Sequence, residues 1–431
     1  MNLVGERLRE ARLARGLTQE QLARGLATKG FICQIERNRA TPSLAKLRVM
    51  AERLGLPLSH FTGDQAAREL NYLGKAAELA VRAAEPRRAL ALVDEGLGLA
   101  GTANERADLL RIRGLALEAL GQLSEALVAQ QTAAATAPPD DPELNARIYV
   151  EMGTILQSGE RFNAAIEANL RALSWLDRCR HADPAMRSRI LHNLGREYYG
   201  LGELAEADTY FKRALAAGTD AESVFRIANA HMSLGVSARA IGELDRAVEH
   251  CNRALELLER QGQERFANRV LNNLGDVHFA SGRIGEARRL QQRCLERARE
   301  INDALEIGIA AGALARYAFE TGDIEDCIKL ARESQAAARQ SGDRLHEAVS
   351  MALEARAAHR QGHGMVADRK FRHALRILAR REAGAKLAEV CALYADVLRE
   401  RGDVDRAFAF MRMAADRDFG GLSRLLRQTA P

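Results

Sequence analysis

The sequence predicts an all-α protein in which an N-terminal five-helix domain precedes an α-solenoid of about nine helical hairpins. Three observations predict this fold class. The 431 residues are 47% hydrophobic but only 5% aromatic, a composition typical of helical proteins. No proline occurs between Pro184 and Pro431, so nothing interrupts successive helices there. Small residues also recur about every 40 residues over most of the chain, which is a signature of repeat architectures.

The first helix of the N-terminal domain is expected from about Val4 to Arg15. Leu8 and Leu13 are predicted to face inward, and Gly16 to end the helix. The domain is expected to span residues 1–64.

Two short helices joined by a tight turn follow. Thr18 is placed to cap a helix from Gln19 to Leu26, the chain turns at Ala27, and Thr28 caps a second helix from Lys29 to Arg37. This arrangement is a helix-turn-helix, whose second helix has the width and polarity to enter a DNA major groove.

The domain is completed by two more predicted helices. Ser43 caps a helix that continues to Leu54, and Pro57 opens another that ends near residues 62–63. Because helix is predicted again from Ala66, we expect a short, semi-rigid joint to the rest of the chain.

Four short motifs support a family resemblance: Leu17-Thr18-Gln19, Leu22-Ala23, Ile35-Glu36-Arg37 and Pro42-Ser43-Leu44. Their order and context resemble the DNA-binding domain of the lambda-repressor/Cro-like (XRE) family. The turn is one residue shorter than the common family form, with Ala27 where a glycine and an apolar residue usually stand. The resemblance implies that the second helix of the pair is a recognition helix.

Ten residues of this region are candidates for DNA contact. Gln34 is suited to a base edge, Lys29 to phosphate or guanine, and Phe31 to a thymine methyl group. The alternative for Phe31 is a place in the core. The predicted DNA-binding set is Gln19, Thr28, Lys29, Gly30, Phe31, Cys33, Gln34, Arg37, Asn38 and Arg39.

The net charge is concentrated in the same domain. Residues 1–64 contain 11 Lys and Arg against 6 Asp and Glu, so they carry the whole net charge of +5, and the remaining chain is neutral. A small basic domain beside a large neutral one favours a nucleic-acid binder with a separate module for another partner.

The repeat consists of three phased ladders of small residues. The second ladder starts at Ala126 and the third at Ala133. In most periods a glycine, expected in the turn, follows the residue of the first ladder. Each period predicts one hairpin, in which small residues let two helices approach closely and the glycine allows a left-handed turn. The first ladder is Gly114, Gly153, Gly195, Gly235, Gly275, Ala315, Ala355 and Ala395.

This pattern is similar to the tetratricopeptide (TPR) repeat. The family period is ~34 residues, so the extra residues here are expected to lengthen either the helices or the loops. A degenerate first unit with Ala77, Ala89 and Gly96 brings the total to about nine hairpins in residues 65–417. Within residues 418–431, Leu422 to Gln428 is predicted as a capping helix.

Polar residues recur on the predicted first helices of the central hairpins, at offsets that share one helix face. The TPR resemblance implies that this face lines a concave groove. Asparagine amides suit a peptide backbone and arginines suit a carboxylate, whereas a merely solvated face is the alternative. The predicted peptide-binding set is Arg189, His192, Asn193, Arg196, Asn229, Ser233, Arg269, Asn272, Asn273, Asp276 and Arg316.

No constellation for catalysis, metal binding or a cofactor is predicted. Gly96, Gly98 and Gly101 match the spacing of a dinucleotide fingerprint, but no strand precedes them. The six cysteines are scattered without a CxxC pair, no apolar run reaches transmembrane length, and the N-terminus lacks a signal-peptide pattern. We therefore expect a cytoplasmic protein that is not an enzyme.

An XRE-type domain on a TPR array resembles the peptide-responsive quorum-sensing regulators of Gram-positive bacteria, the RRNPP group. The resemblance implies a dimeric transcription regulator that binds double-stranded DNA and a short peptide, whose binding alters dimer geometry. The alternative is a protein-interaction scaffold whose DNA-binding domain merely localises it.

Overall fold

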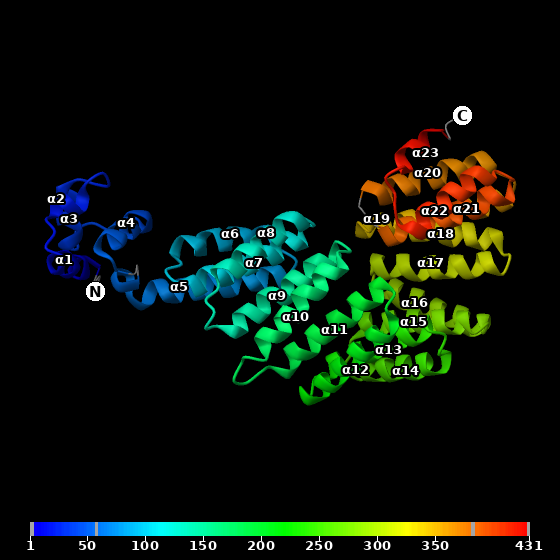
Figure 1. Cartoon of the computed structure of the whole chain (residues 1–431), viewed down its shortest axis with the longest axis horizontal. Helices are drawn as coiled ribbons and strands as arrows, with labels where there is room; N and C mark the ends of the chain where they lie inside the picture. Colours follow the sequence, from blue (N-terminus) through cyan, green and yellow to red (C-terminus); the bar gives the residue numbers. More distant parts are fainter. Residues whose placement is uncertain (1–3, 57–58, 381–383, 429–431) are drawn as a thin grey trace. The chain divides into compact units, whose positions relative to one another are not determined.

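The structure is a computed structural model that describes residues 4–56, 59–380 and 384–428. Among these residues it contains twenty-three helices and no strand, so the all-α prediction is confirmed. Residue contacts divide the chain into two compact units, Met1–Ala182 and Asp183–Pro431. The first unit holds α1 to α10 and the second α11 to α23 (Figure 1). No helix of the described residues has both the length and the hydrophobicity to cross a lipid bilayer.

The N-terminal domain, hereafter the head, begins with four short helices. They are α1 (Val4–Ala14), α2 (Gln19–Ala23), α3 (Lys29–Glu36) and α4 (Leu44–Leu54). Its fully buried core is formed by Leu8, Leu22, Ile32, Ile35, Met50, Leu54 and Phe61. The inward prediction for Leu13 is wrong, because this side chain is 57% exposed. It lies about 140° around α1 from Leu8, at 100° per residue, and so faces away from the core.

The fifth helix, α5 (Ser59–Arg82), is much longer than predicted. The expected end near residues 62–63 is wrong, since the helix continues through 24 residues. Phe61 is buried in the head, whereas Leu70 and Leu73 are buried in the core of the first hairpin. Apolar burial at both ends outweighs the cost of about 1 kcal/mol for a glycine inside a helix. The boundary between residues 64 and 65 remains a prediction, and it falls inside α5.

Nine hairpins follow one another in the part of the chain that the structure describes, in agreement with the prediction of about nine, and each pairs a first helix with a second (Figure 1). In the first unit they are α5 with α6 (Pro86–Leu99), α7 (Ala103–Ala119) with α8 (Leu123–Thr136), and α9 (Pro142–Ser158) with α10 (Phe162–Leu176). In the second unit they are α11 (Pro184–Leu201) with α12 (Leu204–Asp220), α13 (Val224–Ala240) with α14 (Leu244–Arg260), α15 (Glu264–Ala280) with α16 (Ile284–Glu300), α17 (Ala304–Glu320) with α18 (Ile324–Ser341), α19 (Arg344–Arg360) with α20 (Gly364–Arg380), and α21 (Gly384–Glu400) with α22 (Val404–Asp416).

The ladders mark the places where the two helices of a hairpin meet. Every residue of the first ladder is buried, and at Gly195 an added Cβ would lie 2.5 Å from the ring of Phe211 on the partner helix. The turn glycines have φ between 74° and 84°, a left-handed conformation that other residues rarely adopt. In the hairpin of α9 and α10 the corresponding turn position is not a glycine. Glu160 occupies it and takes this conformation with φ 55°.

The repeat period exceeds that of a usual TPR because the helices are longer. From α13 onward most helices have 17 residues and are joined by three residues, as between Ala240 and Leu244. The extra residues relative to the usual TPR period therefore lengthen the helices and not the loops. The predicted final helix is confirmed as α23 (Leu422–Gln428), whose Leu422 and Leu426 are buried against the last hairpins.

Candidate DNA-binding and peptide-binding surfaces

The two helices of the helix-turn-helix begin at the predicted caps. The Oγ1 atom of Thr18 accepts a hydrogen bond from the backbone N–H of Gln21 (3.1 Å), while the Gln21 side chain accepts one from Thr18 N–H (2.7 Å). Thr28 Oγ1 accepts a hydrogen bond from Phe31 N–H (3.2 Å) and so caps α3. These side chains satisfy amides that a helix start leaves unpaired.

The turn between the two helices differs from the prediction. α2 ends at Ala23 and not at Leu26, and residues 24–27 form the turn. Gly25 takes a left-handed conformation with φ 69°, so it makes the turn instead of Ala27. A glycine and an apolar residue, Gly25 and Leu26, thus occupy the turn despite its shorter length.

A buried ion pair holds the recognition helix α3 against α1. Two nitrogens of the Arg12 guanidinium donate to the two carboxylate oxygens of Glu36, at 2.6 and 3.0 Å, and a third donates to the carbonyl of Leu17 (2.7 Å). Burial opposes ionisation of Glu36, but the hydrogen bonds from Arg12 and Gln19 outweigh it and lower the pKa of Glu36. Arg12 was not among the residues predicted to have a role.

Most of the predicted DNA-binding residues are exposed. Lys29, Gln34, Arg37 and Arg39 are exposed, and their side chains have no hydrogen bond or ion pair within the described chain. Thr28, Gly30 and Asn38 are also exposed, whereas Gln19, Phe31 and Cys33 are half-buried. The exposed side of α3 and the following loop therefore presents free donors, which is what contact with a DNA groove needs.

Besides Thr28, which caps α3, three members of the predicted set have contacts within the head. The Gln19 amide donates to Glu36 (2.8 Å), and Asn38 Oδ1 accepts a hydrogen bond from Gly5 N–H (3.1 Å). Phe31 packs partly against the core, with the Lys46 ammonium 4.9 Å from its ring centroid. A place in the DNA-binding set remains a prediction for each of them.

In the second unit, the first helices of successive hairpins pack on one another: α11 on α13, α13 on α15, and α15 on α17. Such contacts place these helices on the inner side of a solenoid's curve. Three predicted residues, Arg189, His192 and Asn229, come together there around a cavity of about 360 Å³. Ser188, Phe225 and Arg226 complete its lining.

His192 joins two of these helices. Its Nε2 lies 2.8 Å from the hydroxyl oxygen of Ser233 on α13. Burial, together with the charges of Arg196 and Arg226, lowers the pKa of His192 to about 4. The imidazole is therefore neutral at physiological pH.

On the next first helices, α15 and α17, several predicted residues are engaged with one another or with neighbours. Arg316 forms an ion pair with Asp276, whose carboxylate also accepts a hydrogen bond from Tyr317 (2.9 Å). Asn272 accepts a hydrogen bond from Gln291 (2.8 Å), and Arg269 lies 3.4 Å from Glu306.

Two predicted asparagines have environments of their own. Asn193 is 7% exposed, and its amide nitrogen has no hydrogen-bond acceptor among the described residues. Asn273 is half-buried and lies on α15, two hairpins after Asn193. Their peptide-binding role remains a prediction.

Two residues of this lining, Arg226 and Phe225, were not in the predicted set. Arg226 lies three residues before Asn229, so it falls on the same face of α13, one turn nearer its start. Extending the polar stripe by one turn would have found it. Phe225 packs edge to face on Phe266 of α15, with ring centroids 4.9 Å apart.

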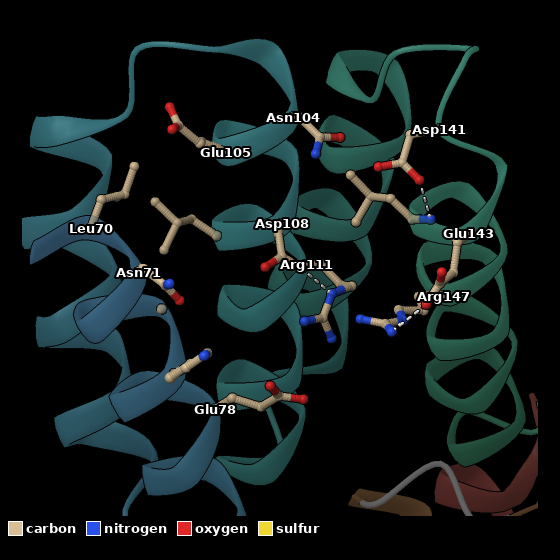
Figure 2. A pocket seen from close by; sticks show the side chains of 14 residues that line it. Leu70, Asn71, Glu78, Asn104, Glu105, Asp108, Arg111, Asp141, Glu143 and Arg147 are labelled. Atoms are coloured by element: carbon tan, nitrogen blue, oxygen red, sulfur yellow. Dashed lines mark hydrogen bonds and ion pairs between the residues drawn. The ribbon is translucent and has the colours of Figure 1, made fainter. Parts of the chain in front are cut away.

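A second cavity, of about 510 Å³, lies in the first unit between α5, α7 and α9 (Figure 2). Its charged side chains mainly bind one another. Arg111 pairs with Asp108 (2.7 Å) and Glu151 (2.9 Å), and Arg147 pairs with Glu143 (2.5 Å). Both arginines of the lining, Arg111 and Arg147, are therefore paired with carboxylates.

Comparisons with known proteins identify the two parts of the chain. A helix-turn-helix family model matches residues 8–61, and tetratricopeptide repeat models match residues 188–218 and 226–300. The immunity repressor protein of Bacillus phage phi105 is 38% identical over 63 residues, which are 14% of this chain and 44% of the repressor. The chain thus spans less than half of that relative. An XRE-type helix-turn-helix and TPR repeats are confirmed.

Solved structures support the fold of most of the chain. A Rap protein complexed with competence and sporulation factor matches with a TM-score of 0.61 and 16% identity, over 85% of this chain and 99% of that one. The apo quorum sensor NprR from B. thuringiensis matches with a TM-score of 0.57 and 14% identity, over 82% of this chain and 99% of that one. At this identity the likeness shows a shared fold.

Proposed function

We propose that the protein is a cytoplasmic transcription regulator that binds an operator through its head and a short peptide through the inner side of its second unit. Peptide binding alters the geometry of a homodimer and so the spacing of its two heads. No enzymatic step belongs to this function. The relatives that support it are a phage repressor and a quorum sensor.

One observation carries the DNA-binding part. Lys29, Gln34, Arg37 and Arg39 are exposed, on α3 or directly after it, without partners in the described chain. A helix-turn-helix whose recognition helix presents free donors fits a major groove, where amides bind base edges and cations bind phosphates.

The peptide-binding part rests on the cavity between α11 and α13. Its arginines and the Asn229 amide provide donors and an acceptor that an extended peptide needs. The inner side of a solenoid also offers a long concave surface for an extended ligand.

A homodimer links the two parts, because helix-turn-helix dimers bind half-sites about one DNA turn, ~34 Å, apart. The second helix of the last hairpin, α22, has three exposed apolar side chains: Val404 is 65% exposed, Phe408 67% and Met411 43%. Their spacing puts them on one helix face. This apolar face supports a contact with a second copy of the chain.

The test of DNA binding is fluorescence anisotropy with the DNA upstream of the protein's own gene at low ionic strength. Wild type should bind, and Arg39→Ala should reduce the slope of log K against log salt by about 1. Gln34→Ala should relax sequence preference. Arg253→Ala, on α14 far along the chain, is the control. A folded head that ignores this DNA at low salt would remove the proposal.

The alternative function, a TPR scaffold whose head merely localises it to DNA, is also favoured by the apolar face of α22. A partner protein in place of a second copy would bury well over ~1,000 Å² there. Affinity capture separates the two: a stoichiometric partner protein that is lost with Phe408→Glu supports the scaffold, whereas a self-associated protein without one supports the regulator.

A further inference from the structure

We propose that His231 and His250 form a binding site for a divalent transition-metal ion, which their two Nδ1 atoms hold in neighbouring coordination positions. His231 lies on α13 and His250 on α14, so the site belongs to one hairpin of the second unit. The two Nδ1 atoms are 3.0 Å apart, and the ring centroids 5.2 Å. This site does not depend on DNA or peptide binding, and it adds a ligand of another kind.

The repeat fold does not require histidines at these two positions. In the hairpin of α15 and α16, 40 residues further on, the same positions are Leu271 and Leu290, which belong to one hydrophobic cluster. In the hairpin of α11 and α12, 40 residues earlier, they are Leu191 and Tyr210. Between α13 and α14, two half-buried polar rings therefore replace an apolar contact. Because burying polar groups costs free energy, the fold alone does not explain this pair.

The separation of the two nitrogens fits metal coordination. Histidine nitrogens bind a metal ion at about 2.0–2.1 Å, so two of them at a right angle lie about 2.8–3.0 Å apart. Right angles occur in square-planar and tetragonal sites, which Ni²⁺ and Cu²⁺ form with nitrogen and oxygen ligands. Two ligands of a tetrahedral ion would lie about 3.3–3.4 Å apart. The distance of 3.0 Å therefore fits an ion whose neighbouring ligands lie at right angles.

Both imidazoles can offer a nitrogen lone pair to a metal. Burial, followed by the charges of neighbouring groups, lowers the pKa of His231 to about 4 and also lowers the pKa of His250. Without a metal, one Nδ1 carries a proton and donates it to the other. When the ion binds, this Nδ1 loses its proton and Nε2 of the same ring takes one up. Both rings then stay neutral, with both Nδ1 atoms on the ion.

The charges around the pair are compatible with a cation. Arg246 and Arg253 act on the rings, but Arg246 pairs with Asp208 (2.6 Å) and Arg253 pairs with Glu256 (2.7 Å). The carboxylate of Glu249 favours positive charge on both imidazoles. Among the described residues, no third His, Cys, Asp or Glu completes a set of three metal ligands. Water therefore fills the remaining coordination positions.

The experiment titrates tag-free, full-length protein with Ni²⁺ in an isothermal titration calorimeter at pH 6.0. At this pH, histidines with the ordinary pKa of about 6.5 are mostly protonated and compete poorly for the metal. His231 stays neutral, because its pKa is about 4. We expect wild type to show a single Ni²⁺ site. A matched titration with Mg²⁺, which prefers oxygen ligands, should show no such site.

Three variants test the ligands. His231→Leu with His250→Leu should lose the Ni²⁺ site and still fold, because it restores the two leucines that the next hairpin has at these positions. His250→Gln keeps one imidazole and a polar side chain, so it should lower the Ni²⁺ affinity at least about tenfold. It keeps the test valid if the leucine variant does not fold. His373→Gln, at an exposed position of α20, is the matched control and should bind Ni²⁺ as wild type does.

The expected result is loss of the Ni²⁺ site in the leucine variant and its retention in His373→Gln. A wild type without a Ni²⁺ site would overturn the inference and leave the pair as a neutral hydrogen bond. Ni²⁺ binding that is equal in wild type, the leucine variant and His250→Gln would also overturn it, since other groups would then hold the ion. Equal binding of Mg²⁺ would overturn it as well. The proposed regulator uses no metal, so its own tests are unaffected by these outcomes.

Discussion

The ion pair between Arg12 and Glu36 makes the recognition helix sensitive to one neutral substitution. Glu36→Gln keeps the side-chain volume but leaves Arg12, whose side chain is 10% exposed, without its counter-charge. Removing one partner of a buried pair costs about 3–5 kcal/mol. Because the partial exposure of Arg12 allows some rehydration, we expect the lower end, about 3 kcal/mol.

That cost is large for a small domain, whose stability is roughly 0.05–0.15 kcal/mol per residue, or about 3–10 kcal/mol for the head. At 1.4 kcal/mol per factor of ten, the open fraction of the head should rise about a hundredfold. Hydrogen exchange with mass spectrometry on peptides that cover residues 19–40 measures this rise, while exchange in the second unit should stay unchanged.

Two variants control for other causes. Arg39→Gln, at an exposed position without a partner in the described chain, should leave exchange in the head unaltered. Arg12→Leu with Glu36→Leu removes both charges and should restore much of the protection, since replacing a buried pair by apolar residues is often neutral. Exchange in Glu36→Gln within threefold of wild type would refute the view that this pair holds α3.

Further substitutions test packing, titration and assembly. Gly5→Ala should destabilise the head by about 1–3 kcal/mol in urea unfolding, because its Cβ would overlap the Ile35 carbonyl, whereas Gly30→Ala has free space and should stabilise it slightly. The pKa of His192 is about 4 in the folded protein against 6.5 ordinarily, so the unfolded chain takes up the proton first as pH falls. The free energy of unfolding should therefore decrease from pH 6.5 to pH 4, and it should decrease less in His192→Gln than in wild type. An equal decrease in the two proteins would contradict this. Phe408→Glu should convert the proposed dimer to a monomer in light scattering, and an unchanged mass would exclude the α22 contact.

Local rules predicted much of the head and the repeat. The threonine and serine caps depend on a side chain and amides three residues away, so the starts of α2, α3 and α4 could be placed from sequence. The ladder residues and turn glycines reflect close helix contact and positive φ, which restrict residue type strongly. These features are determined within one hairpin.

Features that depend on distant packing were missed. The continuation of α5 beyond residues 62–63 depends on apolar burial in two different cores, and a glycine near its start favoured a break. The ion pair joins residues 24 apart, and nothing in the sequence selects Glu36 over other acids as the partner of Arg12. The boundary between the two compact units, just before Pro184, did have a sequence signal. The first-ladder residues on either side of it, Gly153 and Gly195, are 42 residues apart, whereas all later steps of that ladder are 40.

The shared helix α5 also fixes a rotational phase. An α-helix turns about 100° per residue, so a single residue inserted between Phe61 and Leu70 would swing the head about 100° around the axis and advance it ~1.5 Å. Its DNA-facing side would then point in a different direction. Only insertions close to a whole number of turns, such as about seven or about eleven residues, would return it to register. Homologous chains that keep the same operator arrangement should therefore vary in loops and repeat number before they vary in the length of this helix.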